Sequence, residues 1–449
     1  MADFDLALRG GTIITPEGRR RADIGVRGGR ITAIGRVSDA HRVVDADGMF
    51  LMPGGVDTHV HLMDPGSPER EDFPTGTSAA AAAGVTTIIE HAHGRPLRTA
   101  ADLTQKVDYL RGRSHVDFGL AAHAWPGATD AVADLWAAGA AFFKVFTCTT
   151  HGIPGHDAAA LKAHLSASAE VGAVSLMHCE DESLTAAAES ILREQGRDDG
   201  GVLQDWRNRD AEVVAAAVAA MLVRRTGAHA SVAHVSHPEV ASYLHAERQR
   251  GARINAEGCP QYFLTREWEA LEHGALRKFT PPARARNDAD EAEMWRLLRT
   301  GVLTHISTDH APSTLEQKAA GDIWEVHFGL PGLDTTMSIL LDAAARDELS
   351  YEDITRVYSE TPARIYGLAP RKGRLRVGAD ADIIVVDPAA RRVLRNEDVI
   401  SRAGWTPFNG RSVTGRVEQT YLRGDLIAEH GSVPADPQGQ WLPGAGKHR

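Results

Sequence analysis

The chain has 449 residues, of which 43% are hydrophobic and 24% charged, as in an ordinary globular protein long enough for more than one domain. Its 60 acidic and 49 basic side chains give a net charge of −11, so no nucleic-acid partner is expected. Three cysteines are too few for a disulfide framework, and we find neither a signal region nor an apolar run of membrane-spanning length, so we expect a cytoplasmic protein without a membrane partner.

Short β-strands are predicted at both ends of the chain. At the N-terminal end they cover 6–8, 11–14, 23–26 and 30–34, and at the C-terminal end 373–375, 381–386 and 420–422. Each flank is too short for a sound core of its own, so we expect the two to pack together as one small β-sandwich. The Gly- and Pro-rich tail after about residue 430 is predicted to be loosely ordered.

The central part alternates between strands and helices. Strands are predicted near 54–61, 84–90, 117–124, 140–147, 173–179, 229–236, 253–259 and 303–309, with helices near 75–83, 99–112, 128–138, 157–171, 210–226, 238–250 and 288–300. Eight such units predict a (β/α)₈ TIM barrel. An open doubly wound sheet is the alternative, but it would need a Gly-rich dinucleotide-binding loop, and none follows any of these strands. The expected division is 1–53 and 369–449 for the β-sandwich and tail, with the barrel at 54–368 between them.

Polar residues stand at the ends of five predicted strands. In a barrel these carboxyl ends meet at one mouth, where such proteins keep their active sites. A lone His-x-His is weak support for a metal site, but four histidines, a lysine and an aspartate around one point predict a metal centre. The six residues are His59, His61, Lys144, His178, His234 and Asp309.

Lys144 is unusual because it lies within an apolar run. A lysine that extends from a strand end to solvent is the ordinary alternative. Burial lowers the pKa of a lysine, and the neutral amine can add CO₂ to form an anionic carbamate with two oxygens that bridges two cations. Asp309 can ligate a metal, and it can also move a proton between the water and the leaving nitrogen.

Three further histidines end neighbouring strands: His91 and His93 at one, His123 at the next. They could form a separate metal site. The alternative is that one lines the substrate pocket and the others satisfy backbone groups, and their roles stay open at this stage.

Several motifs along nearly the whole chain resemble the cyclic-amidase branch of the amidohydrolase superfamily. They are Met52–His61, Phe143–Phe146, Cys259–Tyr262, Pro281–Arg284, Thr308–Pro312, Gly378–Asp382 and Pro407–Gly410. That branch contains dihydropyrimidinase/hydantoinase, allantoinase and dihydroorotase. The resemblance implies hydrolytic opening of a cyclic amide and two divalent metal ions, usually zinc. It implies that His59, His61 and Asp309 hold one ion, that His178 and His234 hold the other, and that N6-carboxylated Lys144 bridges them. It also implies a homo-oligomer, a tetramer or a dimer.

Four positions bear on the substrate. Met63 stands where dihydroorotases carry an arginine, which disfavours a dihydroorotate-like substrate, and Thr149 stands where hydantoinases carry a tyrosine for the oxyanion. Phe328 replaces an asparagine, whereas Thr280 matches the position that contacts the ring in hydantoinases. We therefore expect a hydantoinase/dihydropyrimidinase-like enzyme, with allantoinase or a hydrolase of another cyclic amide or imide as the alternative. A non-catalytic scaffold is disfavoured because all six ligand positions are present. An exocyclic deaminase of the same superfamily is disfavoured because those enzymes usually use one metal and no lysine on the fourth strand.

Overall fold

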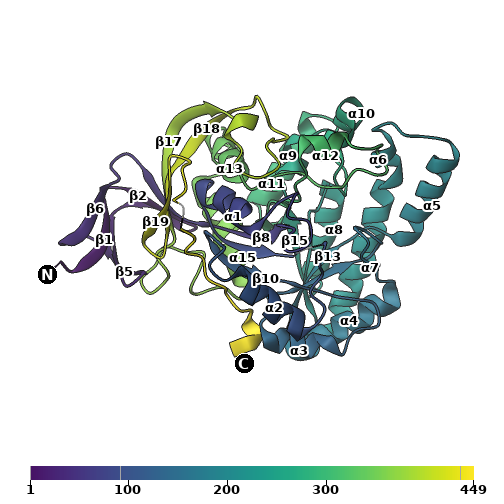
Figure 1. Cartoon of the computed structure of the whole chain (residues 1–449), viewed down its shortest axis with the longest axis horizontal. Helices are drawn as coiled ribbons and strands as arrows, with labels where there is room; N and C mark the ends of the chain where they lie inside the picture. Colours follow the sequence, from purple (N-terminus) through teal and green to yellow (C-terminus); the bar gives the residue numbers. More distant parts are fainter. Residues whose placement is uncertain (1, 92, 435, 449) are drawn as a thin grey trace.

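The computed structural model describes residues 2–91, 93–434 and 436–448 and has a mixed α/β fold. Figure 1 shows helix-free strands at the N-terminal end of the molecule and alternating strands and helices in the remainder. Within the described residues, none of the helices is long and apolar enough to cross a membrane.

Two sheets form the helix-free end. The first has the order β5-β4-β1-β6 and the second the order β19-β18-β17-β7-β2-β3. Their bounds are β1 Phe4–Arg9, β2 Thr12–Thr15, β3 Gly18–Arg21, β4 Asp23–Arg27, β5 Arg30–Gly35, β6 Ala40–Asp45, β7 Phe50–Pro53, β17 Ile383–Val393, β18 Ser412–Leu422 and β19 Asp425–Glu429.

The two ends of the chain meet in the second sheet. β7 pairs with β2 on one side and antiparallel with β17 on the other, where Leu51 faces Val385. Inward-facing aliphatic side chains of both sheets, including Leu6, Ile13 and Ile383, form one buried cluster. The N- and C-terminal flanks therefore share a core, as the length of each flank suggested.

The predicted strand at 373–375 is wrong. Gly373 has a φ of +88°, a left-handed conformation that interrupts a strand. A Cβ at this position would also lie 2.6 Å from the carbonyl oxygen of Ser359. Leu375 is nevertheless buried in the core of the two sheets, which explains its apolar character.

The central strands are parallel and follow the predicted order. They are β8 Gly55–Val60, β9 Val85–Glu90, β10 Asp117–Leu120, β11 Ala122–His123, β12 Phe143–Phe146, β13 Val174–His178, β14 His229–Val232, β15 Arg253–Gly258 and β16 His305–Ile306. β10-β9-β8 form one sheet, and β11 to β16 form another in chain order. Beyond β16 the chain returns to β8, because His61 N–H donates to the carbonyl of His310 (2.8 Å) and Val60 bridges His310.

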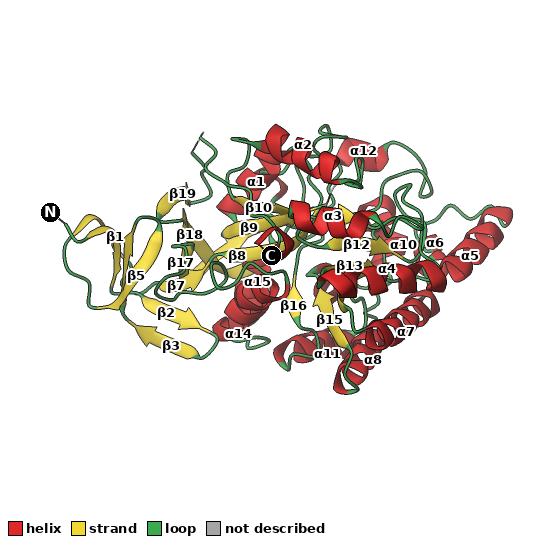
Figure 2. Cartoon of the chain, turned by 90° about the horizontal axis from the view of Figure 1, so that it is seen from below, coloured by secondary structure: helices red, strands yellow, loops and turns green. Residues whose placement is uncertain are grey.

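Helices connect these strands and lie outside them in Figure 2. The helices that match the prediction are α1 Phe73–Ala82, α2 Ala100–Leu110, α3 Ala131–Ala138, α4 Ala158–Val171, α7 Arg209–Thr226, α8 Pro238–Gln249 and α11 Asp288–Arg299. Several begin at side-chain caps, as where Asp157 accepts from the N–H of Ala160.

Further helices were not predicted. They are α5 Glu182–Glu194, α6 Val202–Trp206, α9 Gln261–Leu264, α10 Glu269–His273, α12 Leu315–Ala319, α13 Thr336–Ala345, α14 Tyr351–Thr355 and α15 Thr361–Ile365, with single turns at η1 Gly274–Arg277, η2 Arg356–Glu360, η3 Asn396–Asp398 and η4 Ala445–His448. Every residue of α13 but the last is buried, so it has no polar face and therefore no amphipathic pattern to detect.

The C-terminal tail is packed, contrary to the predicted loose order. Phe118 of β10 donates its N–H to the carbonyl of Gln440 (2.9 Å) and accepts one from Leu442 (2.7 Å). Leu442 is itself buried. The segment therefore extends the edge beside β10, and its glycines, such as Gly439, sit where a Cβ would meet the backbone of Val116.

Candidate active site

A small cavity of about 20 Å³ lies at the carboxyl ends of the parallel strands. All six residues predicted as metal ligands line it, from β8, β12 and β13 and from the residues that follow β8, β14 and β16: His59, His61, Lys144, His178, His234 and Asp309. Each of them is at least nine-tenths buried. The strand ends thus bring together a set that is spread over 250 residues of sequence.

Asp309 and His59 form the middle of the cluster. Oδ1 of Asp309 lies 3.1 Å from Nε2 of His59 and 3.3 Å from Nε2 of His61. Nζ of Lys144 lies 3.0 Å from the same His59 nitrogen. Four donor groups from three parts of the sheet therefore face one small volume.

His178 and His234 form a second pair on the other side. Nδ1 of His178 lies 2.9 Å from Nε2 of His234. One nitrogen of His59, one of His234 and an oxygen of Asp309 also lie within 4.8 Å of one another, so the two halves of the cluster are contiguous.

In three of the four histidines the nitrogen that faces away from the cluster has an oxygen partner, whereas Nδ1 of His234 is buried without a partner among the described residues. His59 Nδ1–H donates to Glu257 Oε1 (2.6 Å), His61 Nδ1–H to the carbonyl of His91 (2.7 Å), and His178 Nε2–H to Glu180 Oε2 (2.7 Å). Such partners fix the tautomer and leave the inner nitrogen with a free lone pair, as in protein metal sites. The arrangement of the donor set therefore suits divalent metal ions.

Burial controls the charges of these groups. It lowers the pKa of His61 to about 4 and that of His234 well below the usual value, so both rings are neutral. Burial also lowers the pKa of Lys144 to about 8, against the opposing charges of Asp309 and Glu257. Although burial alone would raise the pKa of Asp309, the adjacent His59 and His61 lower it well below the usual range.

Two of the clustered residues have a strained backbone. Asp309 has a φ of +50° and His234 a φ of +37°, which non-glycine residues adopt only where the surroundings enforce it. Asp57 supports the first position, because its Oδ1 accepts the N–H groups of Thr308 and His59 (both 3.2 Å). The aspartate of the His-x-His motif thus ties β8 to the segment that carries Asp309.

Two of the four residues that were predicted to contact substrate line the cavity. These are Thr280, whose hydroxyl donates to Glu180 Oε2 (2.7 Å), and Phe328. Met63 is buried and Thr149 is exposed, with its N–H donating to Glu182, and neither is among the described residues that line the cavity.

Sequence reasoning missed the carboxylates that orient the histidines. Glu180 lies two residues after His178 and contacts Arg207, whose NH1 is 3.3 Å from Oε2. Burial would raise the pKa of Glu180, but Arg207 and His178 lower it to about 2. The signal available was a glutamate at or just after the end of a strand, both here and at Glu257.

A second buried cluster of acids lies outside this site. Oxygens of Asp117, Asp380 and Asp382 surround Nζ of Lys372 at 2.6, 3.0 and 2.6 Å. Lys372 is therefore the buried cation of this cluster, while Arg371 and Arg423 also pair with Asp380 and Asp117. The cluster joins β10 to the segment that leads into β17.

The sequence and the fold are similar to those of known enzymes. The model of the amidohydrolase family matches residues 50–427. An allantoinase of Rubrobacter xylanophilus is 34% identical and one of Escherichia coli 32% identical, each over 98% of both chains. Among solved structures, an L-hydantoinase (dihydropyrimidinase) from Arthrobacter aurescens is 29% identical with a TM-score of 0.94, covering 98% of this chain and 100% of that one. A D-hydantoinase (dihydropyrimidinase) from Thermus sp. is 25% identical with a TM-score of 0.92, covering 99% and 100%.

The family match spans far more than half of the sequence, and the relatives align over nearly their whole length. Their names place them among enzymes of cyclic amides, as the motifs of the sequence suggested. This chain therefore belongs to the amidohydrolase family, in its cyclic-amidase branch.

Proposed function

We propose that this protein is a metal-dependent hydrolase that opens the ring of a cyclic amide at its C–N bond. The enzyme class rests on full-length similarity to allantoinases and hydantoinases. The observation that carries the metal dependence is the convergence of six buried donor groups on one cavity.

Two ions suit the two halves of the cluster. In this proposal His59, His61 and Asp309 hold one and His178 and His234 the other, with the carbamate of Lys144 between them. Zinc matches the imidazole and carboxylate donors. The lowered pKa of Lys144 favours the neutral amine that reacts with CO₂. Bound in pairs, such ions polarise a carbonyl and lower the pKa of water.

Asp309 is placed for proton transfer. Its carboxylate borders the cavity and stays ionised, because His59 and His61 lower its pKa. It therefore accepts the proton of the attacking water and returns it to the ring nitrogen that leaves.

The cavity walls favour a small ring with one apolar side. Phe146 and Phe328 supply the apolar surface, while His93, His151 and Thr280 supply polar atoms. Hydantoin, dihydropyrimidine and other cyclic amides or imides of similar size are the leading substrates. Allantoin is a second candidate, favoured by the 34% identity to an allantoinase.

The fold proposal is a closed (β/α)₈ barrel. Parallel pairing runs from β11 to β16, and the bridge between Val60 and His310 joins the far end to β8. The N–H of Ala121 donates to the carbonyl of Glu90 (2.9 Å), which supports closure at the junction between β10 and β11. The barrel would span 54–368, with the β-sandwich and tail at 1–53 and 369–449.

A cytoplasmic homo-oligomer, a tetramer or a dimer, completes the proposal. The three cysteines, Cys148, Cys179 and Cys259, are free and buried, which suits a reducing compartment. Light scattering on the purified chain measures the oligomeric state.

Hydrolysis assays test the function. The chain is loaded with Zn²⁺ or Mn²⁺ and bicarbonate and offered hydantoin, 5-substituted hydantoins, dihydrouracil, allantoin, dihydroorotate and phthalimide. We expect ring opening of at least one, little with dihydroorotate, and a loss of activity in Lys144→Ala but not in Lys162→Ala, an exposed lysine of α4. Full activity in Lys144→Ala would refute the carbamate, and a metal-free chain inactive on every ring would indicate a scaffold.

A further inference from the structure

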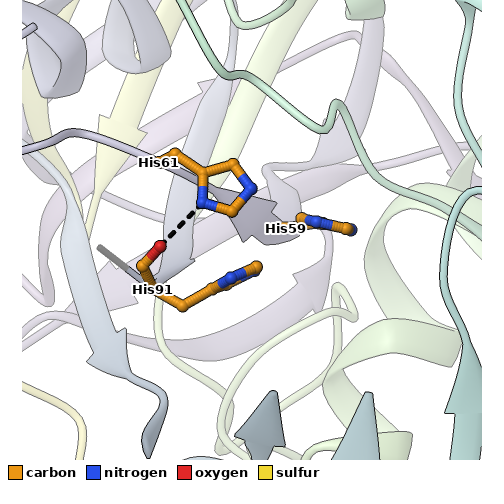
Figure 3. A group of neighbouring side chains, drawn as sticks. All are labelled: His59, His61 and His91. Atoms are coloured by element: carbon orange, nitrogen blue, oxygen red, sulfur yellow. Dashed lines mark hydrogen bonds between the residues drawn. The ribbon is translucent and has the colours of Figure 1, made fainter. Parts of the chain in front are cut away.

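His91 lies against the first pair of proposed ligands. Its ring centroid is 4.6 Å from that of His59 and 4.2 Å from that of His61. One ring nitrogen from each of the three residues lies within 4.8 Å of the other two. Figure 3 shows the three rings gathered at the ends of neighbouring strands, with the His91 carbonyl bonded to His61.

The ring of His91 has no hydrogen-bond partner among the described residues. Both of its nitrogens are buried and unpaired, and the residue is fully buried. Burying a polar group without a partner costs about 1–3 kcal/mol, so a buried imidazole of this kind requires an explanation.

Contact with substrate does not explain why the ring of His91 is buried without a hydrogen-bond partner. His93, two residues later, lines the cavity together with the six proposed ligands, whereas the ring of His91 lies against His59 and His61 and is not among the described residues that line the cavity. His123 is also buried with both nitrogens unpaired, but its ring centroid is 6.3 Å from that of His91 and it belongs to none of the groups of potential metal ligands found in the described residues.

We propose that His91 is a further ligand of the ion that His59, His61 and Asp309 hold. This inference rests on the proposed metal centre and adds to it a residue of β9's carboxyl end. Donor atoms that share one zinc ion with bonds of ~2.1 Å lie roughly 3–4 Å apart, so the three nitrogens, now within 4.8 Å of one another, have to approach by up to roughly 1 Å to share the ion. One of the unpaired ring nitrogens of His91 then has a partner, and the ion has three imidazoles and one carboxylate beside the carbamate of Lys144.

If His91 is a ligand, the two ions respond differently to the loss of the Lys144 carbamate. With four ligands from side chains that need no modification, the first ion remains bound when the carbamate of Lys144 is absent. The second ion, with only His178 and His234 left, does not.

Metal content tests the inference without reference to activity. Wild type, Lys144→Ala, His91→Ala, His91→Gln and the double variant His91→Ala/Lys144→Ala are loaded with Zn²⁺, dialysed against a chelator and analysed by mass spectrometry of the metal. We expect two ions per chain in wild type, one in Lys144→Ala and none in the double variant. Chelator competition should show at least a tenfold lower affinity for the tighter ion in both His91 variants. Substitution with Co²⁺ gives a second readout, since loss of a nitrogen ligand changes its visible absorption.

His123→Ala is the matched control, because it removes a buried, unpaired imidazole nearby and should leave metal affinity and Co²⁺ absorption unchanged. If the His91 variants match this control while wild type holds two ions, His91 is not a ligand and the binuclear proposal stands. If wild type binds no divalent ion at all, the proposed function itself fails. Circular dichroism confirms that each variant is folded, and His91→Gln preserves most of the side-chain volume.

Discussion

Glu257 of β15 is predicted to set the metal affinity of the site although it does not face the cavity. Its Oε1 accepts from His59 Nδ1 at 2.6 Å and from the backbone N–H of His234 at 3.2 Å. It therefore orients one proposed ligand from each half of the cluster. Glu257→Gln keeps the shape and an acceptor oxygen but removes the charge.

The expected loss follows from these contacts. A hydrogen bond to a charged group contributes about 1.5–3 kcal/mol and a neutral one about 0.5–1.5 kcal/mol, so the change costs roughly 1.4 kcal/mol, or about tenfold in metal affinity. Glu257→Ala also leaves the His59 N–H unpaired, and its loss should approach the roughly 100-fold seen when partners of metal-bound histidines are removed.

Competition with a chelating dye measures the affinity of wild type and both variants. Glu212→Gln is the control, since Glu212 is a buried carboxylate of α7 that accepts from the N–H of Ser236 at 3.0 Å and lies 3.7 Å from the ring of His237, which is not a proposed ligand. The reasoning is refuted if Glu257→Gln retains zinc as tightly as wild type, or if Glu212→Gln loses as much.

Three further outcomes concern stability. Lys372→Met leaves Asp382 without a cation and Asp117 with Arg423 alone, and it should lower the free energy of unfolding by about 3–5 kcal/mol, measured in urea; a loss under 1 kcal/mol would contradict this. Burial raises the pKa of Glu212 from 4.5 to about 7, so the folded protein holds a proton that the unfolded chain releases, and stability falls as pH rises from about 4.5 through 7. Glu212→Gln should therefore gain stability relative to wild type at pH 8 but not at pH 4, and equal differences at both would refute the assignment. Gly54→Ala places a Cβ 2.2 Å from the hydroxyl oxygen of Thr86 and should cost about 1–3 kcal/mol, partly recovered when Thr86→Ala is added.

The strand ends could be predicted from sequence because the pattern is local. A buried strand with a glycine before it and a polar residue at its end can be recognised from its own residues. The sequence therefore predicts that His59, Lys144 and His178 lie at one mouth of the barrel. The helices α5 and α13 were missed for different reasons. A single helix was expected between the strands that became β13 and β14, and α13 lacks a polar face.

The partners of the histidines could not be predicted. Whether Glu257 meets His59 depends on the register of β15 against its neighbours and on side-chain rotamers, neither of which the sequence specifies. His91 was visible as half of a His-x-His pair, but its role depends on where β9 ends. Because the strand stops at Glu90, the ring of His91 turns toward His59 and His61 while His93 reaches the cavity.

The sheet that contains strands from both ends of the chain can be completed only late in synthesis. β7 can pair with β2 as soon as both have left the ribosome, but its other neighbour, β17, follows about 330 residues later. At a synthesis rate of about 5–20 residues per second, the strand Phe50–Pro53 remains without its partner β17 for roughly 20–70 s. During that interval the N-terminal half-sheet presents an unpaired, largely apolar edge, the kind of surface that promotes aggregation. Folding yield at high expression should therefore depend on how well chaperones shield this short strand.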